Sequence, residues 1–121
     1  MKKSELGAWG EKLAAENLET DGYRIVDRNF RCRLGEIDLI ARRGRELVFI
    51  EVKLRKDASY GEAREFVTSG KQRKLLLTAE YYLVSHPWAQ ELQPRFDVVE
   101  VYAPQGIEGP SEIHRLENAF E

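Results

Sequence analysis

The sequence predicts an α/β fold for this protein, in a single domain that covers residues 1–121. Two segments, 4–21 and 68–85, have the apolar spacing and the end signals of long helices. Other segments are short apolar runs rich in Ile, Val, Leu and Phe, which favour strands. A length of 121 residues suits one compact domain, and a hydrophobic content of 42% is sufficient for a buried core.

The first helix is expected to begin after Ser4, whose hydroxyl can cap it, and to run to about Asp21, before Gly22. One acid, Glu11, does not lie on the polar side of this helix. It falls among small apolar residues, namely Gly7, Ala8, Ala14, Ala15 and Leu18. A carboxylate at that position should point at the body of the protein. Glu11 is therefore either a buried acid held by an arginine or a backbone group, or a member of a functional site.

Three strands are expected next, over residues 23–30, 36–41 and 47–53. The link between the last two is short and contains a glycine, so an antiparallel hairpin is the simplest connection. Because side chains alternate along a strand, Asp38 and Glu51 can converge on one side of this hairpin, with Lys53 beside Glu51. A register slip of one residue would separate them.

Residues 54–70 are polar and predict a loop, with a short helix near 62–67. A strand is expected over 95–102, and residues 112–120 are compatible with either a closing strand or a short helix.

The second long helix is expected to be capped by Thr68 or Ser69 and to end near Ser85. Its first turn carries three basic residues, Lys71, Arg73 and Lys74. Positive charge at a helix start opposes the helix dipole, and a bound phosphate or bulk solvent would offset that cost.

Charge is distributed unevenly along the chain, although the net charge is only −2 at pH 7. Residues 24–56 contain ten basic and five acidic side chains, whereas residues 80–121 contain two basic and eight acidic ones. A basic segment around a few embedded acids suits a site for phosphate and a metal, and a solvated charged face is the alternative.

Some classes of protein are excluded by composition. The single cysteine, Cys32, rules out an internal disulfide and a cysteine-rich zinc site. No apolar run approaches the roughly 20 residues needed to span a membrane. The start of the chain, Met1-Lys2-Lys3, is not followed by an apolar stretch, so we expect a cytoplasmic protein that is not associated with membranes.

The acids and the lysine in the hairpin form a recognisable pattern. Asp38, twelve intervening residues and then Glu51-x-Lys53 resemble the PD-(D/E)xK nuclease superfamily. Over nearly the whole chain, the sequence is similar to the YraN-like uncharacterised protein family 0102 (UPF0102), which resembles archaeal Holliday-junction resolvases. It runs through Gly7-x-x-Gly10-Glu11-x-x-Ala14-Ala15, Arg28-Asn29-Phe30-Arg31, Gly35-Glu36-Ile37-Asp38-Leu39-Ile40-Ala41, Val48-Phe49-Ile50-Glu51-Val52-Lys53-x-Arg55, Lys71 and Arg95-Phe96-Asp97-Val98-Val99. One departure is Ile37, where the superfamily pattern has a proline.

The resemblance implies a restriction-endonuclease-like core, a mixed central β-sheet flanked by helices. It also implies that Asp38 and Glu51 hold Mg²⁺ or Mn²⁺, with the backbone carbonyl of Val52 as a further ligand. Lys53 would orient or help to deprotonate the attacking water, or neutralise developing charge. Glu11 would complete the site.

Two alternatives concern the ligand set. Glu36 is expected on the same strand face as Asp38 and could replace it. The three residues Asp38, Glu51 and Lys53 could also be a buried salt-bridge cluster with one net negative charge, which a cation would compensate.

Nucleic-acid contacts are expected from basic residues in and beyond the basic segment, namely Lys71, Arg31, Arg33 and Arg55, with Arg42 and Arg43 as further candidates. For each one taken singly, a solvated surface charge is the simpler interpretation. Both histidines are interpreted as structural or exposed, Arg95 and Asp97 as a structural ion pair, and both tryptophans as packing residues.

The function implied is that of a metal-dependent nuclease, a hydrolase of phosphodiester bonds in DNA that acts on branched or repair intermediates. The alternatives are a non-catalytic nucleic-acid-binding module that keeps the fold, and an accessory protein that docks through its acidic C-terminal part. Symmetric cutting of a two-fold junction would require a homodimer, because one chain contains one site.

Overall fold

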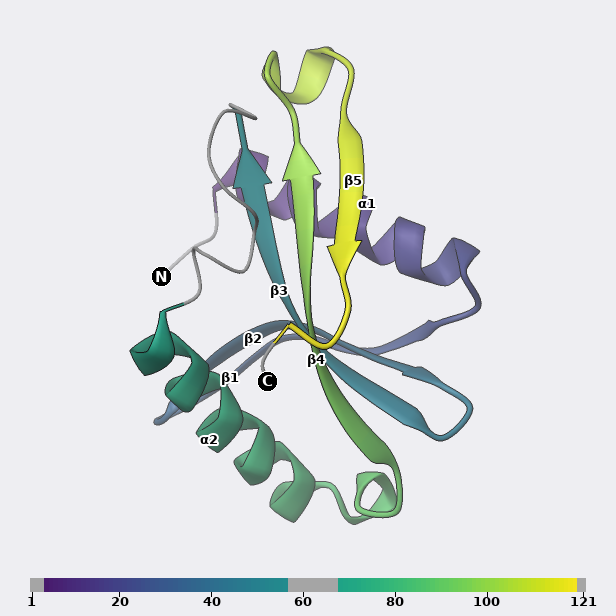
Figure 1. The fold of residues 1–121 in the computed structure, drawn as a ribbon, viewed down its shortest axis with the longest axis vertical. Coiled ribbons are helices and arrows are strands. Elements are labelled where there is room, and N and C mark those ends of the chain that lie inside the picture. The colour runs from purple at the N-terminus through teal and green to yellow at the C-terminus, as the bar shows by residue number, and fades with distance from the viewer. Residues whose placement is uncertain (1–3, 57–67, 120–121) are drawn as a thin grey trace.

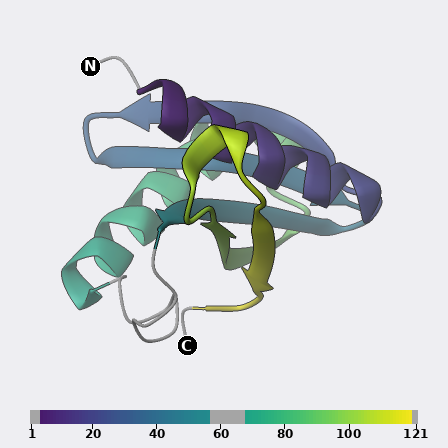
Figure 2. The same ribbon diagram turned by 90° about the horizontal axis from the view of Figure 1, so that it is seen from above.

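A five-stranded mixed sheet forms the centre of the molecule, with one long helix on each of its faces (Figure 1, Figure 2). This computed structural model describes residues 4–56 and 68–119. The elements are α1 (Glu5–Thr20), β1 (Arg24–Cys32), β2 (Gly35–Arg43), β3 (Glu46–Arg55), α2 (Ser69–Ser85), η2 (Pro87–Ala89), β4 (Gln93–Tyr102), η3 (Gly106–Glu108) and β5 (Glu112–Leu116). The α/β fold predicted from the sequence is therefore confirmed.

The strands follow one another in the sheet in chain order, β1-β2-β3-β4-β5. Every neighbouring pair is antiparallel except β3 and β4, which are parallel. Helix α2 provides the long connection that a parallel pair needs. The arrangement is consistent with a restriction-endonuclease-like core.

Both predicted helix starts are confirmed by their caps. The hydroxyl of Ser4 accepts a hydrogen bond from the Gly7 N–H at 3.0 Å, and that of Thr68 accepts one from the Lys71 N–H at 3.2 Å. At the other end of α1 the chain passes through Gly22, which has φ +86° and terminates the helix.

The C-terminal segment forms strand β5, so of the two alternatives for residues 112–120 the strand is the one observed over 112–116. It pairs antiparallel with β4, from Val98 opposite Leu116 to Tyr102 opposite Glu112. The short helix predicted near residues 62–67 lies outside the described residues.

The predicted hairpin between β2 and β3 is present, and it opens into a fork. Its pairing runs from Arg43 opposite Glu46 to Leu39 opposite Ile50. Beyond that point β3 continues beside β4 as far as Arg55, whereas β1 and β2 turn aside together (Figure 1). Asp38 and Glu51 are the first residues past the last pair, so they lie at the opening of the fork.

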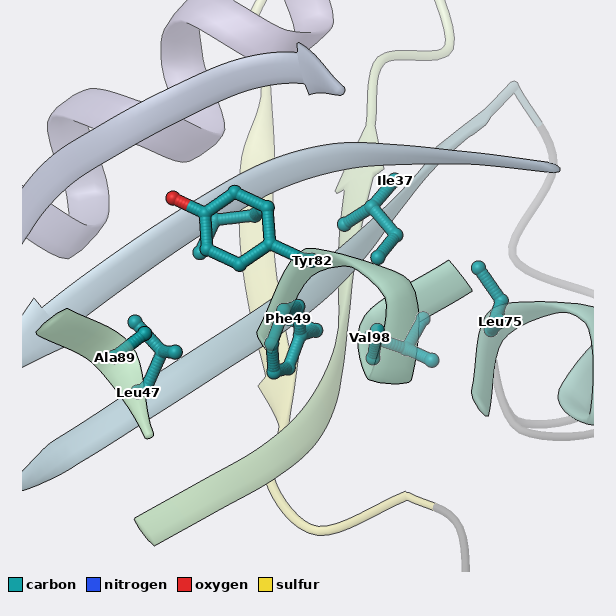
Figure 3. Packing of buried hydrophobic residues seen from close by; sticks show 9 residues of the cluster. Ile37, Leu47, Phe49, Leu75, Tyr82, Ala89 and Val98 are labelled. Carbon is teal, nitrogen blue, oxygen red and sulfur yellow. The ribbon is translucent and has the colours of Figure 1, made fainter. Parts of the chain in front are cut away.

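Two hydrophobic clusters cover the two faces of the sheet. On the α1 side the cluster consists of Ala14, Ala15, Leu18, Tyr23, Leu39, Ala41, Val48, Ile50 and Val99. On the α2 side it consists of Ile37, Ile40, Leu47, Phe49, Leu75, Ala79, Tyr82, Ala89 and Val98 (Figure 3). Neither long helix is long and apolar enough to cross a lipid bilayer.

Side-chain alternation is interrupted in β2 next to the fork. Ile37 and Ile40 both belong to the α2-side cluster although they are three residues apart, and Leu39 lies on the other side. The strict alternation expected along this strand therefore does not hold, because β2 leaves its partner β3 at this point. The neighbouring strand β1 is also irregular here, with Asn29 at φ +50°.

Candidate metal and phosphate site

Asp38 lies at the opening of the fork and its side chain takes over a main-chain role. The residue is buried, and its Oδ2 accepts the N–H of Val52 at 2.8 Å. This is the N–H that faces the fork where the ladder between β2 and β3 ends. The hydrogen bond fixes the carboxylate at the fork and satisfies a main-chain donor that would otherwise be unpaired.

Glu51 lies on the opposite arm of the fork, and two lysines converge on one of its oxygens. Lys71 Nζ is 3.2 Å from Glu51 Oε1, and Lys53 Nζ is 4.0 Å from the same atom. Lys53 comes from β3, whereas Lys71 comes from the first turn of α2. The Glu51 side chain is only 12% exposed, whereas the side chains of Lys71 and Lys53 are 36% and 27% exposed.

The two lysines differ in how readily they lose a proton. Burial, together with the hydrogen bond and positive charge of Lys71, lowers the pKa of Lys53. Burial also disfavours charge on Lys71, but its hydrogen bonds to Lys53 and Glu51 and the charge of Glu51 raise its pKa. Lys53 is therefore the easier of the two to deprotonate.

The charges at the fork balance one another. Two carboxylates, Asp38 and Glu51, lie beside two ammonium groups, Lys53 and Lys71. The sequence predicted a group of three with one net negative charge; the fourth member comes from α2 and removes that excess. Among the described residues, the negative charge of Asp38 and Glu51 is matched by Lys53 and Lys71. Charge compensation alone therefore does not require a bound cation.

An open pocket of about 250 Å³ lies at the fork, between the strands and the start of α2. It is lined by Gly35, Glu36, Asp38, Glu51, Lys71, Lys74 and Leu75. The predicted convergence of Asp38 and Glu51 is thus observed. Glu36 also lines the pocket, where it forms an ion pair with Arg31.

Gly35 allows β2 to approach α2 closely at this pocket. A Cβ atom added to Gly35 would lie 2.8 Å from Thr78 Oγ1, well inside normal contact distance. The Thr78 hydroxyl is held in place because it donates to the Lys74 carbonyl at 2.7 Å. Gly35 was not predicted individually as a site residue. Its position at the start of the segment 35–41, directly before Glu36 and Asp38, was the signal that could have indicated it.

Glu11 is buried, as its position on the helical wheel predicted. Its Oε1 accepts a hydrogen bond from Asn29 Nδ2 at 2.9 Å, so a side-chain amide is one of the groups that hold it. Asn29 was not predicted as its partner. The available signal was an asparagine inside a strand-like run, because asparagine tolerates the positive φ that Asn29 adopts and can mark an irregular point in a strand. Glu11 does not line the pocket at the fork.

Within residues 4–56 and 68–119, no three His, Cys, Asp or Glu side chains come together as a metal-binding group. Glu11, Asp38 and Glu51 do not form a three-carboxylate cluster there. The metal ligands Asp38, Glu51 and the carbonyl of Val52, and the roles of Glu11 and Lys53, therefore stay predictions.

The predicted nucleic-acid contacts lie in different environments. Lys71 is at the fork, and Arg33 is exposed in the turn between β1 and β2. Arg31 is half-exposed and pairs with Glu36. Arg55 is buried in an ion pair with Glu100 at 2.5 Å, so a structural role accounts for it.

The structural ion pair between Arg95 and Asp97 is confirmed. Arg95 donates to both carboxylate oxygens at 2.9 Å, and the Asp97 side chain is fully buried. This pairing raises the pKa of Arg95. Because Arg95 also donates to Glu46 and Tyr23, it ties the far end of the hairpin to β4 and β1.

The histidines were expected to be structural or exposed, and the tryptophans to be packing residues. The ring of His86 stacks on Tyr82 with centroids 3.8 Å apart, whereas His114 is exposed. Trp88 differs from the expected packing residue because 46% of it is exposed, and only part of its surface packs on the core.

The mixed sheet, its fork with two acids and two lysines, and the helix on each face define an α/β protein with a restriction-endonuclease-like core. The chain belongs to the uncharacterised protein family UPF0102, whose family model matches residues 10–101. It is 47% identical over 120 residues to a UPF0102 protein of Caldicellulosiruptor saccharolyticus, covering 99% of this chain and 100% of that protein. It is 40% identical over 120 residues to one of Caldanaerobacter subterraneus subsp. tengcongensis, covering 99% and 98%. It is 42% identical over 120 residues to one of Syntrophotalea carbinolica, covering 99% and 94%.

Proposed function

We propose that this protein is a metal-dependent nuclease that hydrolyses phosphodiester bonds in DNA, including branched or repair intermediates. The observation that carries this proposal is the fork itself, where Asp38 and Glu51 from separate arms line one open pocket beside Lys53 and Lys71. Acids that can hold a cation and ammonium groups that can hold phosphate are the two requirements of phosphodiester hydrolysis.

The donor set at the fork fits Mg²⁺ or Mn²⁺. These hard cations take one or two carboxylates, main-chain oxygens and several waters, and do not need a complete cage of protein ligands. Asp38 and Glu51 would hold the ion, with the carbonyl of Val52 as a third ligand. Once bound, the ion would stabilise negative charge on the phosphoryl oxygens and lower the pKa of a coordinated water.

The protein's own groups have separable tasks. The N–H of Val52 orients Asp38 and keeps its carboxylate at the fork. Lys71, in the first turn of α2, would bind a phosphate oxygen, and the N-terminal end of the helix favours that negative charge. Lys53 Nζ, the ammonium group with the lowered pKa, would hold or release the proton of the attacking water.

A cleavage assay on linear, flapped and four-way DNA with Mg²⁺ or Mn²⁺ tests the proposal. We expect wild-type protein to cleave at least one of these substrates, and Asp38→Asn to reduce the rate by at least about 100-fold. Glu36→Gln distinguishes the two candidate ligands, because it removes the other β2 carboxylate of the same pocket, one already paired with an arginine; a larger loss in this variant than in Asp38→Asn would assign the ligand to Glu36. Cleavage that survives Asp38→Asn would refute the assigned site.

A non-catalytic nucleic-acid-binding or accessory module is the second candidate function. The balance of charge among the two acids and two lysines favours it, because those groups can persist as a structural cluster without a cation. DNA binding by wild-type protein without cleavage in either metal would support this alternative. Light scattering would show whether the chain forms the homodimer that symmetric cutting of a junction requires.

A further inference from the structure

A second open pocket lies at the other end of α2, next to η2. It has a volume of about 460 Å³ and is lined by Arg24, Val26, Arg42 and Trp88. Helix α2 thus has the fork at its first turn and this pocket beyond its last turn. Of the residues that the sequence predicted as nucleic-acid contacts, Arg42 lines it.

The two arginines of this pocket are direct neighbours, and neither has an acidic partner among residues 4–56 and 68–119. Arg24 and Arg42 lie opposite each other in the pairing of β1 and β2. Like charges in that position destabilise a sheet. Arg42 donates to the carbonyl of Gly44, and neither arginine forms an ion pair with an acid in the described residues. The nearby acid on β1, Asp27, is instead hydrogen-bonded to Tyr82.

Trp88 supplies an aromatic surface beside these charges. It meets the rings of Tyr82 and His86 at nearly right angles, with centroids 6.3 Å away in both cases. Those contacts fix the indole, and 46% of the residue stays exposed. A held but exposed aromatic ring beside arginines that form no ion pair in the described part of the chain is the combination with which proteins bind unpaired nucleotides, through base stacking and phosphate contacts.

The spacing between the two pockets matches a short piece of one DNA strand. Asp38 and Arg42 are four residues apart on β2, which corresponds to about 13 Å along a strand. The pockets lie at the two ends of α2, whose 17 residues span about 26 Å. Successive phosphates of one DNA strand advance about 3.4 Å along a duplex axis, so a strand that connects the two pockets spans several nucleotides.

We propose that this second pocket binds an unpaired nucleotide of the DNA strand whose backbone occupies the fork. Trp88 stacks on the base, and Arg24 and Arg42 bind the adjoining phosphates. The inference rests on the proposed nuclease function and makes it more specific: the substrate class is DNA with a single-stranded segment several nucleotides from the cleaved bond.

Binding without a divalent metal tests this pocket independently of cleavage. Full-length protein in EDTA is titrated into a fluorescein-labelled 12-nucleotide oligo-dT, with a blunt duplex as comparison, and anisotropy is measured. We expect Trp88→Leu to weaken binding of oligo-dT about tenfold and Trp88→Phe to retain most of it, because Phe preserves an aromatic face. Leu keeps apolar bulk against Tyr82, which protects the fold.

The arginines are tested by salt dependence. Arg24→Gln is expected to reduce the slope of log K against log salt by about 0.7, the value for one phosphate contact with a single strand. Lys12→Gln is the charge-matched control, since Lys12 is exposed on α1, over the opposite face of the sheet. A Trp9→Phe variant leaves Trp88 as the only tryptophan, and we expect oligo-dT to quench its fluorescence more than the duplex does.

The outcomes separate this inference from the proposed function. Unchanged oligo-dT affinity in both Trp88→Leu and Arg24→Gln would overturn the second pocket, whatever the cleavage assay shows. Loss of self-association in Trp88→Leu with unchanged DNA affinity would overturn it as well, and would assign this surface to protein contact. Pocket-dependent binding in a wild-type protein that never cleaves would support the pocket and refute the nuclease.

Discussion

Replacing Glu51 by glutamine is expected to destabilise the metal-free protein. The carboxylate lies between two ammonium groups, at 3.2 Å from Lys71 Nζ and 4.0 Å from Lys53 Nζ. Glutamine keeps the size of the side chain and removes its charge, so the two lysines would face each other without their shared counter-ion. At a metal site built only from acids, the same substitution would relieve repulsion and stabilise the metal-free protein.

The magnitude follows from burial and distance. Removing one partner of a fully buried ion pair costs about 3–5 kcal/mol, whereas an exposed pair contributes at most about 1 kcal/mol. The Glu51 side chain is 12% exposed and that of Lys71 36%, so the pair lies between these limits. We expect Glu51→Gln to lower the free energy of unfolding by about 1–3 kcal/mol.

Urea denaturation in EDTA at pH 7, followed by circular dichroism, measures this difference. Glu36→Gln is the control in the same pocket and should change stability by less than about 0.5 kcal/mol, because its pair with Arg31 is more exposed. Adding Lys71→Gln to Glu51→Gln should restore part of the loss, since one of the two repelling charges disappears. An unchanged or increased stability of Glu51→Gln would refute the described cluster.

Three further perturbations test other parts of the structure. Arg95→Gln should reduce the free energy of unfolding by about 3–5 kcal/mol in urea, because Asp97 is then a buried charge without its partner; a loss under 1 kcal/mol would contradict this. Gly35→Ala should cost about 1–3 kcal/mol by the same measurement, and Thr78→Ala should recover part of it by removing the hydroxyl that the new methyl group meets. Burial raises the pKa of Tyr82 to about 12, above its unfolded value near 10, so stability should fall as pH rises between these values. Tyr82→Phe should show a smaller fall over that range, and an equal fall in both proteins would be inconsistent with the raised pKa.

Local signals were sufficient to predict most of the fold. Capping hydroxyls at Ser4 and Thr68 define both helix starts, and short apolar runs separated by a glycine-containing link define the hairpin. These features depend only on residues that are close together in the sequence, so they can be recognised from one sequence alone. The closing segment was ambiguous because its apolar residues, Ile113 and Leu116, fit either element, and pairing with β4 decides between them.

The part of the candidate site that lies on paired strands could be predicted from the sequence. The predicted hairpin places Asp38 and Glu51 at the same level of two adjacent strands, directly after the last pair, Leu39 and Ile50, although the alternation of side chains is interrupted in β2. The contact between Lys71 and Glu51 was not predicted, because it depends on how α2 lies over the sheet. The bond between Glu11 and Asn29 was missed for the same reason, since it joins α1 to an irregular part of β1.

The irregular course of β1 has a consequence for how copies of this protein can meet. Among the described strands, β1 is outermost on one side of the sheet, where unpaired main-chain groups could recruit a strand from another molecule. Its register shifts between Ile25 and Asp27, and Asn29 adopts a left-handed conformation. Exposed arginines, including Arg28, also follow this edge. Bulges and charges of this kind discourage edge-to-edge aggregation, so a sheet shared between copies through β1 is disfavoured.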